Sequence, residues 1–211
     1  MVSAPSSSTG RSNSERRQTR GEKTRDRLLV AGAKVFARHG YHAARVDDIV
    51  KAASTSHGTF YLYFGSKEVL FESLMDTIAE EFVQLVEQIP PAIDGTPAHR
   101  ADFDRWLAAL ANLSVRVGPM MNVWATTDTT AESPRGRVTN ALVERLSASI
   151  AAGPGPEPSP EPLDIEIAVT AIWAMFERLC QYIGTGQLDV RVSELVDITS
   201  DIFFDTLRFP S

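Results

Sequence analysis

The sequence lacks the features of a secreted, membrane-spanning or fibrous protein. Its 211 residues include a single cysteine, Cys180, so no disulfide bond can form within the chain, as is usual in a reducing compartment. The longest apolar run, Ile167–Phe176, is about half of the roughly 20 residues that a transmembrane helix needs. The N-terminus has no apolar core of a signal peptide. We therefore expect a soluble, cytoplasmic protein.

The motifs of common enzyme classes are also missing. The sequence contains no P-loop, no G-x-G-x-x-G after a strand, no G-x-S-x-G elbow and no H-E-x-x-H zinc motif. His39 and His42 flank Gly40 without a third ligand nearby, which does not suit a metal site. Cys180 lies in an apolar helical pattern, where burial is more usual than reactivity. We predict no catalytic residue, no metal site and no cofactor; an enzyme is the less favoured alternative.

The charge is unevenly distributed along the chain. The net charge is -6, but residues 1–67 carry 12 Lys+Arg and 5 Asp+Glu, whereas residues 68–211 carry 9 and 22. Such an asymmetry indicates a basic end that meets a polyanion. A basic tail is the simpler explanation, because four arginines lie in residues 1–20. Residues 21–67 nevertheless retain 8 basic and 4 acidic side chains.

Apolar residues recur at helical spacing, and no segment alternates as a strand does, so the sequence predicts an all-α fold. Residues 1–20 contain almost nothing to bury and are predicted to be a disordered basic arm. Residues 21–67 are predicted to form a three-helix domain, with Gly40 as the stop signal of its first helix. The second helix fits Val46–Ala53 and the third fits His57–Phe64.

Residues 68–211 are predicted to form a larger helical domain, which gives about nine helices in all. A Pro-rich linker at 153–162 precedes the last two helices. Ser66 is expected to cap the helix that begins at Lys67. The predicted helices are 67–89, 99–117, 119–129, 133–152, 164–184 and 192–208.

Residues 45–67, RVDDIVKAASTSHGTFYLYFGSK, have the anatomy of a helix-turn-helix, in which the second helix enters the major groove. Hydroxyl groups at its start favour phosphate, and a glycine permits a close approach of the backbone. Phe60 and Phe64 are expected to be buried. The residues predicted to contact DNA are Arg45, Thr55, Ser56, His57, Gly58, Thr59, Tyr61, Tyr63 and Lys67.

This run resembles the N-terminal domain of TetR-family transcriptional regulators, whose pattern reads roughly I-A-x-x-A-G-V-S-x-G-T-x-Y-x-Y-F-x-x-K. Two positions depart from that pattern. Ser54-Thr55 replaces the usual Gly-Val of the turn, and Arg45 stands where a capping Thr is usual. The resemblance covers about residues 22–70. The matching residues are Ile49-Val50, Ala53, Ser56, Gly58-Thr59, Tyr61, Tyr63-Phe64 and Lys67.

The resemblance implies a homodimeric repressor that binds double-stranded DNA at a palindromic operator and leaves it when a small-molecule effector enters the C-terminal domain. Dimerisation would use 164–184 and 192–208 as a four-helix bundle; the alternative is that both helices pack only internally. Residues 67–89 would connect the two domains. A helical adaptor that binds an acidic protein is a further alternative.

The effector is predicted to be a small apolar or amphipathic molecule in a cavity between the middle helices. Aromatic and methionine side chains at helical spacing suit such a wall, although the same pattern is more often plain core. Pro119 is expected to interrupt the helix near this cavity. The candidate ligand-binding residues are Phe103, Trp106, Leu110, Met120, Met121, Trp124, Trp173 and Phe176.

Overall fold

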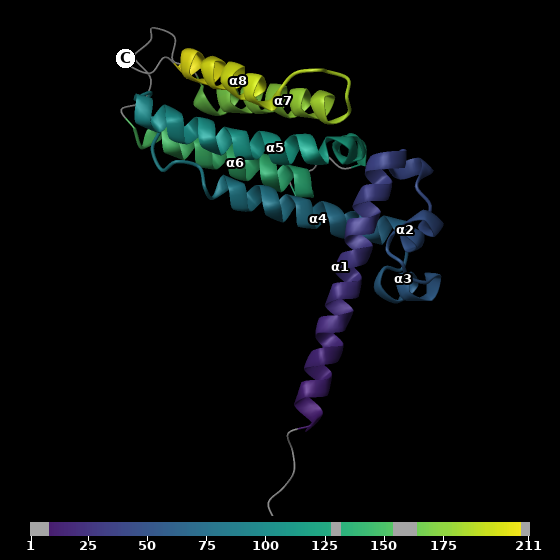
Figure 1. The fold of residues 1–211 in the computed structure, drawn as a ribbon. Coiled ribbons are helices and arrows are strands. Elements are labelled where there is room, and N and C mark those ends of the chain that lie inside the picture. Colours follow the sequence, from purple (N-terminus) through teal and green to yellow (C-terminus); the bar gives the residue numbers. More distant parts are fainter. Residues whose placement is uncertain (1–8, 128–131, 154–163, 208–211) are drawn as a thin grey trace, which may run out of the picture. The chain divides into compact units, whose positions relative to one another are not determined.

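The computed structural model describes residues 9–127, 132–153 and 164–207, with side chains described from residue 21 to 120 in the first of these ranges. Within this part of the chain every regular element is an α-helix, so the all-α prediction is confirmed (Figure 1). The helices are α1 (Thr9–Ala43), α2 (Val46–Ala52), α3 (His57–Tyr63), α4 (Lys67–Val86), α5 (Pro97–Thr127), α6 (Pro134–Ala151), α7 (Ile165–Gly184) and α8 (Val192–Leu207).

The chain divides into two compact units, Met1–Leu74 and Met75–Ser211. The first holds α1, α2, α3 and the start of α4, and the second holds the rest of α4 with α5 to α8. We placed the domain boundary between residues 67 and 68, at the start of α4, whereas the division lies inside that helix. No helix in the described ranges is long and apolar enough to cross a membrane.

Helix α1 is longer than the sequence predicted. Residues 9–20, which we expected to be a disordered arm, continue the helix, and residues 1–8 lie outside the described residues. The segment is polar but has few strong helix breakers, so a helix can extend along it. At the other end Gly40 adopts φ 74° and ψ 161°, a conformation open almost only to glycine. The main part of α1 therefore ends at a kink at Gly40, as predicted, and a short helical stretch continues to Ala43.

Helix α5 corrects the predicted helix count. We expected two helices, 99–117 and 119–129, but α5 runs through Pro119 without a break, so the structure describes eight helices and not nine. Proline cannot donate to the carbonyl of Val115, four residues earlier. That carbonyl faces α7 at a close crossing: a Cβ on Gly184 would lie 2.3 Å from the Val115 oxygen. The freed oxygen thus lies against a glycine of the neighbouring helix.

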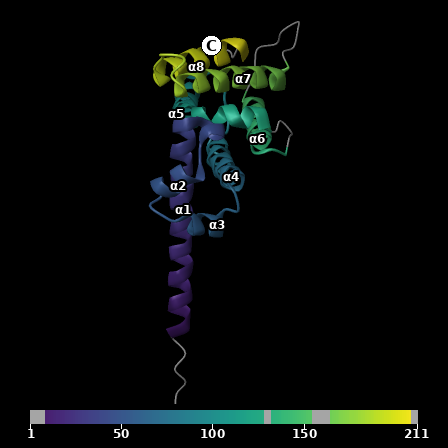
Figure 2. The same ribbon diagram turned by 90° about the vertical axis from the view of Figure 1, so that its right-hand side faces the viewer.

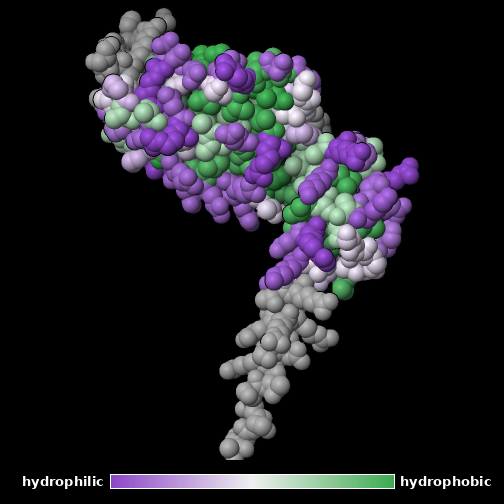
Figure 3. Space-filling view, in the orientation of Figure 1, coloured by the Kyte–Doolittle hydropathy of each residue, from purple (hydrophilic) through white to green (hydrophobic). Residues whose placement is uncertain are grey.

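The core of the second unit lies among α5, α6, α7 and α8, which pack on one another (Figures 1 and 2). Helix α7 buries one broad face, including Val169, Trp173 and Phe176. Ile167 and Ile198 are more than half exposed on α7 and α8. Hydrophobic side chains reach the surface on this side of the unit (Figure 3).

Candidate nucleic-acid interface

The helix-turn-helix is built from α2 and α3 around buried apolar side chains. Ile49 and Val50 face inward from α2, and Phe60 of α3 and Phe64 just after it are at most 1% exposed. The predicted burial of both phenylalanines is therefore confirmed. Arg45 precedes α2 in an extended conformation, and its exposed side chain makes no capping hydrogen bond. The guanidinium is thus available for a contact outside the domain.

The turn after α2 is a Schellman motif with a serine at its left-handed position. The Thr55 N–H donates to the Val50 carbonyl at 2.9 Å, and the Ser54 N–H donates to the Lys51 carbonyl at 3.2 Å. Ser54 has φ 50°, the one positive φ of a non-glycine residue among those described. The turn therefore closes as it does with glycine, and Ser54 bears the steric cost of its Cβ.

We expect Ser54→Gly to stabilise the protein by about 1 kcal/mol, because glycine adopts this conformation without the Cβ penalty. Thermal unfolding followed by circular dichroism should show a Tm higher by roughly 3 °C. Ser54→Ala serves as the control, since it removes the hydroxyl and retains the Cβ. An equal gain in both variants would mean that the hydroxyl, and not the backbone, is unfavourable.

Ser56 is the N-cap of α3. Its Oγ accepts from the Thr59 N–H at 3.2 Å and lies 2.9 Å from Thr59 Oγ1. The two hydroxyls that we predicted to face phosphate therefore form a local capping pair. Thr55 is half-buried and its amide closes the turn. Thr55, Ser56 and Thr59 therefore make hydrogen bonds that fix the start of α3.

The outward face of α3 carries His57, Gly58, Tyr61 and Leu62, all of which are exposed. His57 Nε2 lies 2.9 Å from Asp47 Oδ1 at the start of α2, so the imidazole is held by the neighbouring helix. Leu62 is 77% exposed, the most exposed large hydrophobic side chain among the described residues. Sequence reasoning missed Leu62, although burial of Phe60 and Phe64 turns residue 62 outward. The signal in the sequence that could have identified Leu62 is an apolar residue at a helical position that faces solvent.

Tyr63 points back into its own domain. It is half-buried, and its hydroxyl lies 3.4 Å from the position of a Cβ on Gly21 of α1. Arg25, one turn along α1, places its guanidinium 5.4 Å from the centroid of the Phe64 ring. The stretch of α1 around Gly21 and Arg25 therefore packs on the end of α3. Tyr63 was predicted as a DNA contact, and its place here is between two helices.

Lys67 is engaged within the first unit. Its Nζ donates to the Tyr41 carbonyl at 2.9 Å and to the Ala44 carbonyl at 3.2 Å, and lies 4.5 Å from the centroid of the Tyr41 ring. Two of its three N–H donors are thus used. The Tyr41 hydroxyl donates to Glu68. The pKa of Tyr41 is raised, first by burial and then by the negative charge of Glu68. The phosphate contact predicted for Lys67 stays a prediction, whereas its contacts tie α4 to the end of α1.

The predicted N-cap of α4 agrees with the contacts of Ser66. Its Oγ accepts from the Val69 N–H at 3.3 Å. The hydrogen bond from Ser66 is also the largest cause that lowers the pKa of the Glu68 carboxyl, in the first turn of α4. A carboxylate in this position suits the positive end of the helix dipole.

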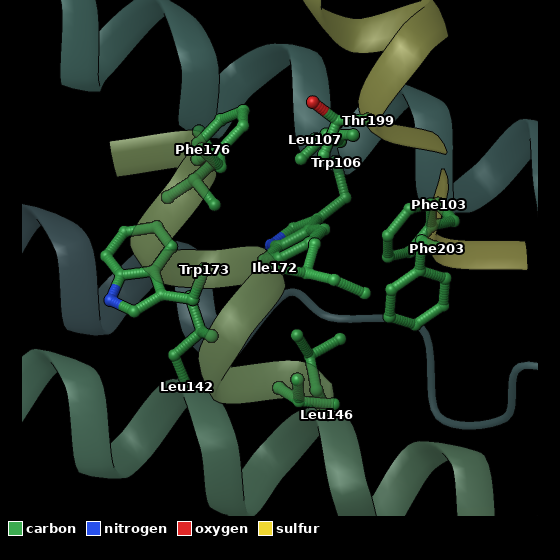
Figure 4. Close-up of a pocket in the computed structure, with 12 residues that line it drawn as sticks. Phe103, Trp106, Leu107, Leu142, Leu146, Ile172, Trp173, Phe176, Thr199 and Phe203 are labelled. Carbon is green, nitrogen blue, oxygen red and sulfur yellow. The ribbon is translucent and has the colours of Figure 1, made fainter. Parts of the chain in front are cut away.

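A second site is the apolar cavity of the C-terminal unit (Figure 4). Five of the eight predicted ligand-binding residues line it, and all five are buried aromatic or leucine side chains. Met120 is buried but does not line it, and the side chains of Met121 and Trp124 lie outside the described residues. The predicted residues that line it are Phe103, Trp106, Leu110, Trp173 and Phe176.

Sequence reasoning missed the wall residues contributed by α6 and α8 and some of those contributed by α5 and α7. No local pattern distinguishes their apolar residues from ordinary core residues, because the cavity arises only when four helices meet. Thr199 is the polar exception on this wall; it is 2% exposed, and its Oγ1 has no hydrogen-bond partner among the described residues. The missed apolar residues are Leu107, Leu142, Leu146, Val169, Ile172 and Phe203.

The single cysteine and the histidines offer no second chemistry. Burial raises the pKa of the Cys180 thiol to about 12, so the nucleophilic thiolate is scarce at neutral pH. Within the described ranges no three His, Cys, Asp or Glu side chains are grouped as metal ligands.

Comparisons with known proteins match this arrangement. A family model described as bacterial regulatory proteins, tetR family, matches residues 28–74. An uncharacterized HTH-type transcriptional regulator of Bacillus subtilis, YdgC, is 39% identical over 72 residues, 34% of this chain and 37% of YdgC. The HTH-type transcriptional repressor NicS of Pseudomonas putida is 38% identical over 68 residues, 32% of each chain. The matched stretch thus spans about a third of these curated relatives.

Solved structures resemble the whole fold. A TetR-like transcriptional regulator from Rhodococcus sp. RHA1 has a TM-score of 0.63 at 20% identity, over 87% of this chain and 95% of its own. FadR of Bacillus subtilis, solved with stearoyl-CoA, has a TM-score of 0.60 at 19% identity, over 84% and 96%. The helix-turn-helix is therefore similar in sequence to that of the tetR family of bacterial regulatory proteins, and the fold of the chain is similar to that of TetR-like regulators.

Proposed function

We propose that the chain is a sequence-specific repressor that binds a palindromic operator as a homodimer and is released by a small effector. The observation that carries this proposal is the open face of α3. The side chains of His57, Tyr61 and Leu62 are exposed on this face. On the opposite side of the helix, Phe60 and Phe64 are buried in the domain core. A seven-residue helix held in this way is presented outward, as a major-groove helix must be.

The contacts divide by chemistry. Arg45, at the start of α2, suits a phosphate, because its guanidinium is exposed and makes no capping bond. His57 and Tyr61 suit base edges or phosphates on the groove side, and Leu62 suits a thymine methyl group. Specificity would arise from the α3 residues, and the salt dependence of binding from the basic residues around them.

Gly58 provides a test of DNA binding by α3, because no packing contact within the described part of the chain requires a glycine at this position. A Cβ at this position would meet only Ser56 Oγ, at 3.9 Å. We expect Gly58→Ala to leave the Tm unchanged or raise it slightly through helix propensity, yet to weaken operator binding about tenfold, or ~1.4 kcal/mol. Anisotropy titration beside a thermal melt measures both. Unchanged DNA affinity would mean that the α3 backbone does not approach DNA closely.

The dimer would form through α7 and α8. Both helices bury one face in the core and leave isoleucines exposed on another: Ile167 is 68% exposed and Ile198 is 55% exposed. Two such helices from each copy form a four-helix bundle across a twofold axis. The twofold axis would set two α3 helices about 34–36 Å apart, one turn of DNA.

The effector would occupy the cavity of the C-terminal unit. Its wall consists almost wholly of aromatic and aliphatic side chains (Figure 4), which suits a small apolar or amphipathic molecule. FadR of Bacillus subtilis, which has a similar fold, was solved in complex with stearoyl-CoA, which has a long apolar chain; this supports an effector with an apolar part. An effector that binds one conformation better lowers DNA affinity by that difference.

The experiment is an anisotropy titration of duplex DNA from beside the gene, at two salt concentrations, with sedimentation of the free protein. We expect a dimer, and affinity that falls steeply as salt rises. Random duplex of the same length is the control for specificity. Absence of binding at low salt, to this DNA and to random genomic fragments, would favour the adaptor alternative.

A further inference from the structure

We infer that Trp106 is the gate of the effector cavity and that its indole also couples the cavity to the end of α4. This inference rests on the proposed function, since it concerns how an effector enters and acts. Trp106 lines the internal cavity and also a groove on the surface of the same unit, which has a volume of about 400 Å³. Among the lining residues described, it is the one that the two spaces share.

The cavity as it stands in the structure is too small for an effector. Its volume is about 20 Å³, room for about one water molecule, whereas pockets for small ligands measure roughly 300–1,000 Å³. Part of the wall must therefore move before a ligand enters. Movement of the Trp106 indole would join the cavity to the groove beside Pro90 and Pro91, and so open a route from solvent.

The other aromatic residues of the wall are held by ring contacts within it. Phe103 stacks on Phe203 with centroids 4.4 Å apart, and Trp173 stacks on Phe176 at 5.9 Å. Trp106 meets Phe103 in a tilted contact at 5.5 Å. Figure 4 shows its indole between these two pairs, so its departure leaves both pairs in place.

The indole N–H links the gate to α4. Trp106 Nε1 donates to the Leu85 carbonyl at 2.8 Å, in the last turn of the helix that begins at Lys67. Trp106 is 6% exposed, so displacing the ring leaves a buried donor without this partner unless α4 moves with it. Entry of a ligand would therefore shift the end of α4, the helix that runs into the DNA-binding unit.

The wall also selects the ligand class. No charged side chain lines the cavity, so no described group there would pair with a carboxylate or a phosphate. The buried Thr199 hydroxyl, which lacks a partner among the described residues, is the one polar side-chain oxygen on the wall. The geometry therefore favours an uncharged apolar ligand with a single hydrogen-bonding group.

Stopped-flow fluorescence with N-phenyl-1-naphthylamine, an uncharged apolar probe with one N–H, tests the gate in the full chain without DNA. We compare Trp106→Ala with Trp173→Ala, which removes the same volume from the same cavity but does not face the groove. Trp173 also makes one indole hydrogen bond, to Thr139 Oγ1 at 3.3 Å. We expect the association rate to rise at least tenfold more in Trp106→Ala than in Trp173→Ala.

Equal association rates in the two variants would overturn the gate, and absence of probe binding in every variant would overturn the cavity as the ligand site. Trp106→Leu is the milder replacement if Trp106→Ala does not fold, with the same expectation. Because no DNA is present, a failure of the gate is distinguishable from a failure of the repressor function.

Trp106→Phe tests the coupling, because it retains a ring and removes the N–H. We expect the probe to weaken operator binding at least fivefold in wild type and less than twofold in Trp106→Phe. The same factor in Trp106→Phe as in wild type would show that the bond to Leu85 carries no coupling. If no protein bound DNA, the repressor function would fail while the rate measurements stood.

Discussion

Replacing Gly184 with alanine is expected to lower the free energy of unfolding by about 3 kcal/mol, at the upper end of the effects of overpacking. The new Cβ would lie 2.3 Å from the Val115 oxygen and 3.2 Å from the Gly118 Cα. Both are backbone atoms, so no rotamer change relieves the clash and α5 must move away from α7. Thermal unfolding followed by circular dichroism should show a Tm lower by roughly 10 °C.

Two further alanine variants calibrate this result. A Cβ on Gly118 would meet its nearest neighbour, the Gly184 Cα, at 3.2 Å, so Gly118→Ala should cost less, about 1 kcal/mol. A Cβ on Gly65 would meet nothing within 4 Å, so Gly65→Ala should change the Tm little. If the Tm of Gly184→Ala equalled that of Gly65→Ala, the close crossing of α5 and α7 would not exist in solution.

The α5–α7 crossing shows why the sequence predicts some features of the fold and not others. Gly40 stops its helix for a local reason, and local chemistry is legible in a sequence. Pro119 carries an equally strong local signal, yet α5 continues because the helix packs against α7, and the freed Val115 carbonyl lies against Gly184. Tertiary packing overrode a local preference there, and no pattern near Pro119 indicates a glycine 65 residues later.

The candidate site divides in the same way. Burial of Phe60 and Phe64 follows from helical spacing, and the stop after α2 follows from the family pattern despite Ser54. The partners of polar side chains do not follow, because they depend on which helices meet. His57 of α3 meets Asp47 of α2, and Lys67 of α4 meets the Tyr41 and Ala44 carbonyls, and neither pairing has a signature in the sequence.

Lys67 is the sharpest such case, and its removal is expected to have the second largest effect. The residue stands at the lysine of the family pattern, which suggests a phosphate contact, but its ammonium donates to the Tyr41 and Ala44 carbonyls. Hydrogen bonds to charged groups contribute about 1.5–3 kcal/mol. We expect Lys67→Ala to lower the free energy of unfolding by about 2 kcal/mol, measured by urea denaturation.

The salt dependence of DNA binding separates the two roles of Lys67. A lysine that neutralises a phosphate contributes about one unit to the slope of log affinity against log salt. We expect Lys67→Ala to weaken binding because the first unit is loosened, with the slope unchanged, since two of the three N–H donors are used inside the domain. Arg45→Ala is the matched control: its exposed guanidinium makes no capping bond, so it should flatten the slope by about one unit and leave the stability unchanged. A flatter slope with full stability in Lys67→Ala would restore the phosphate contact and contradict the tie between α1 and α4.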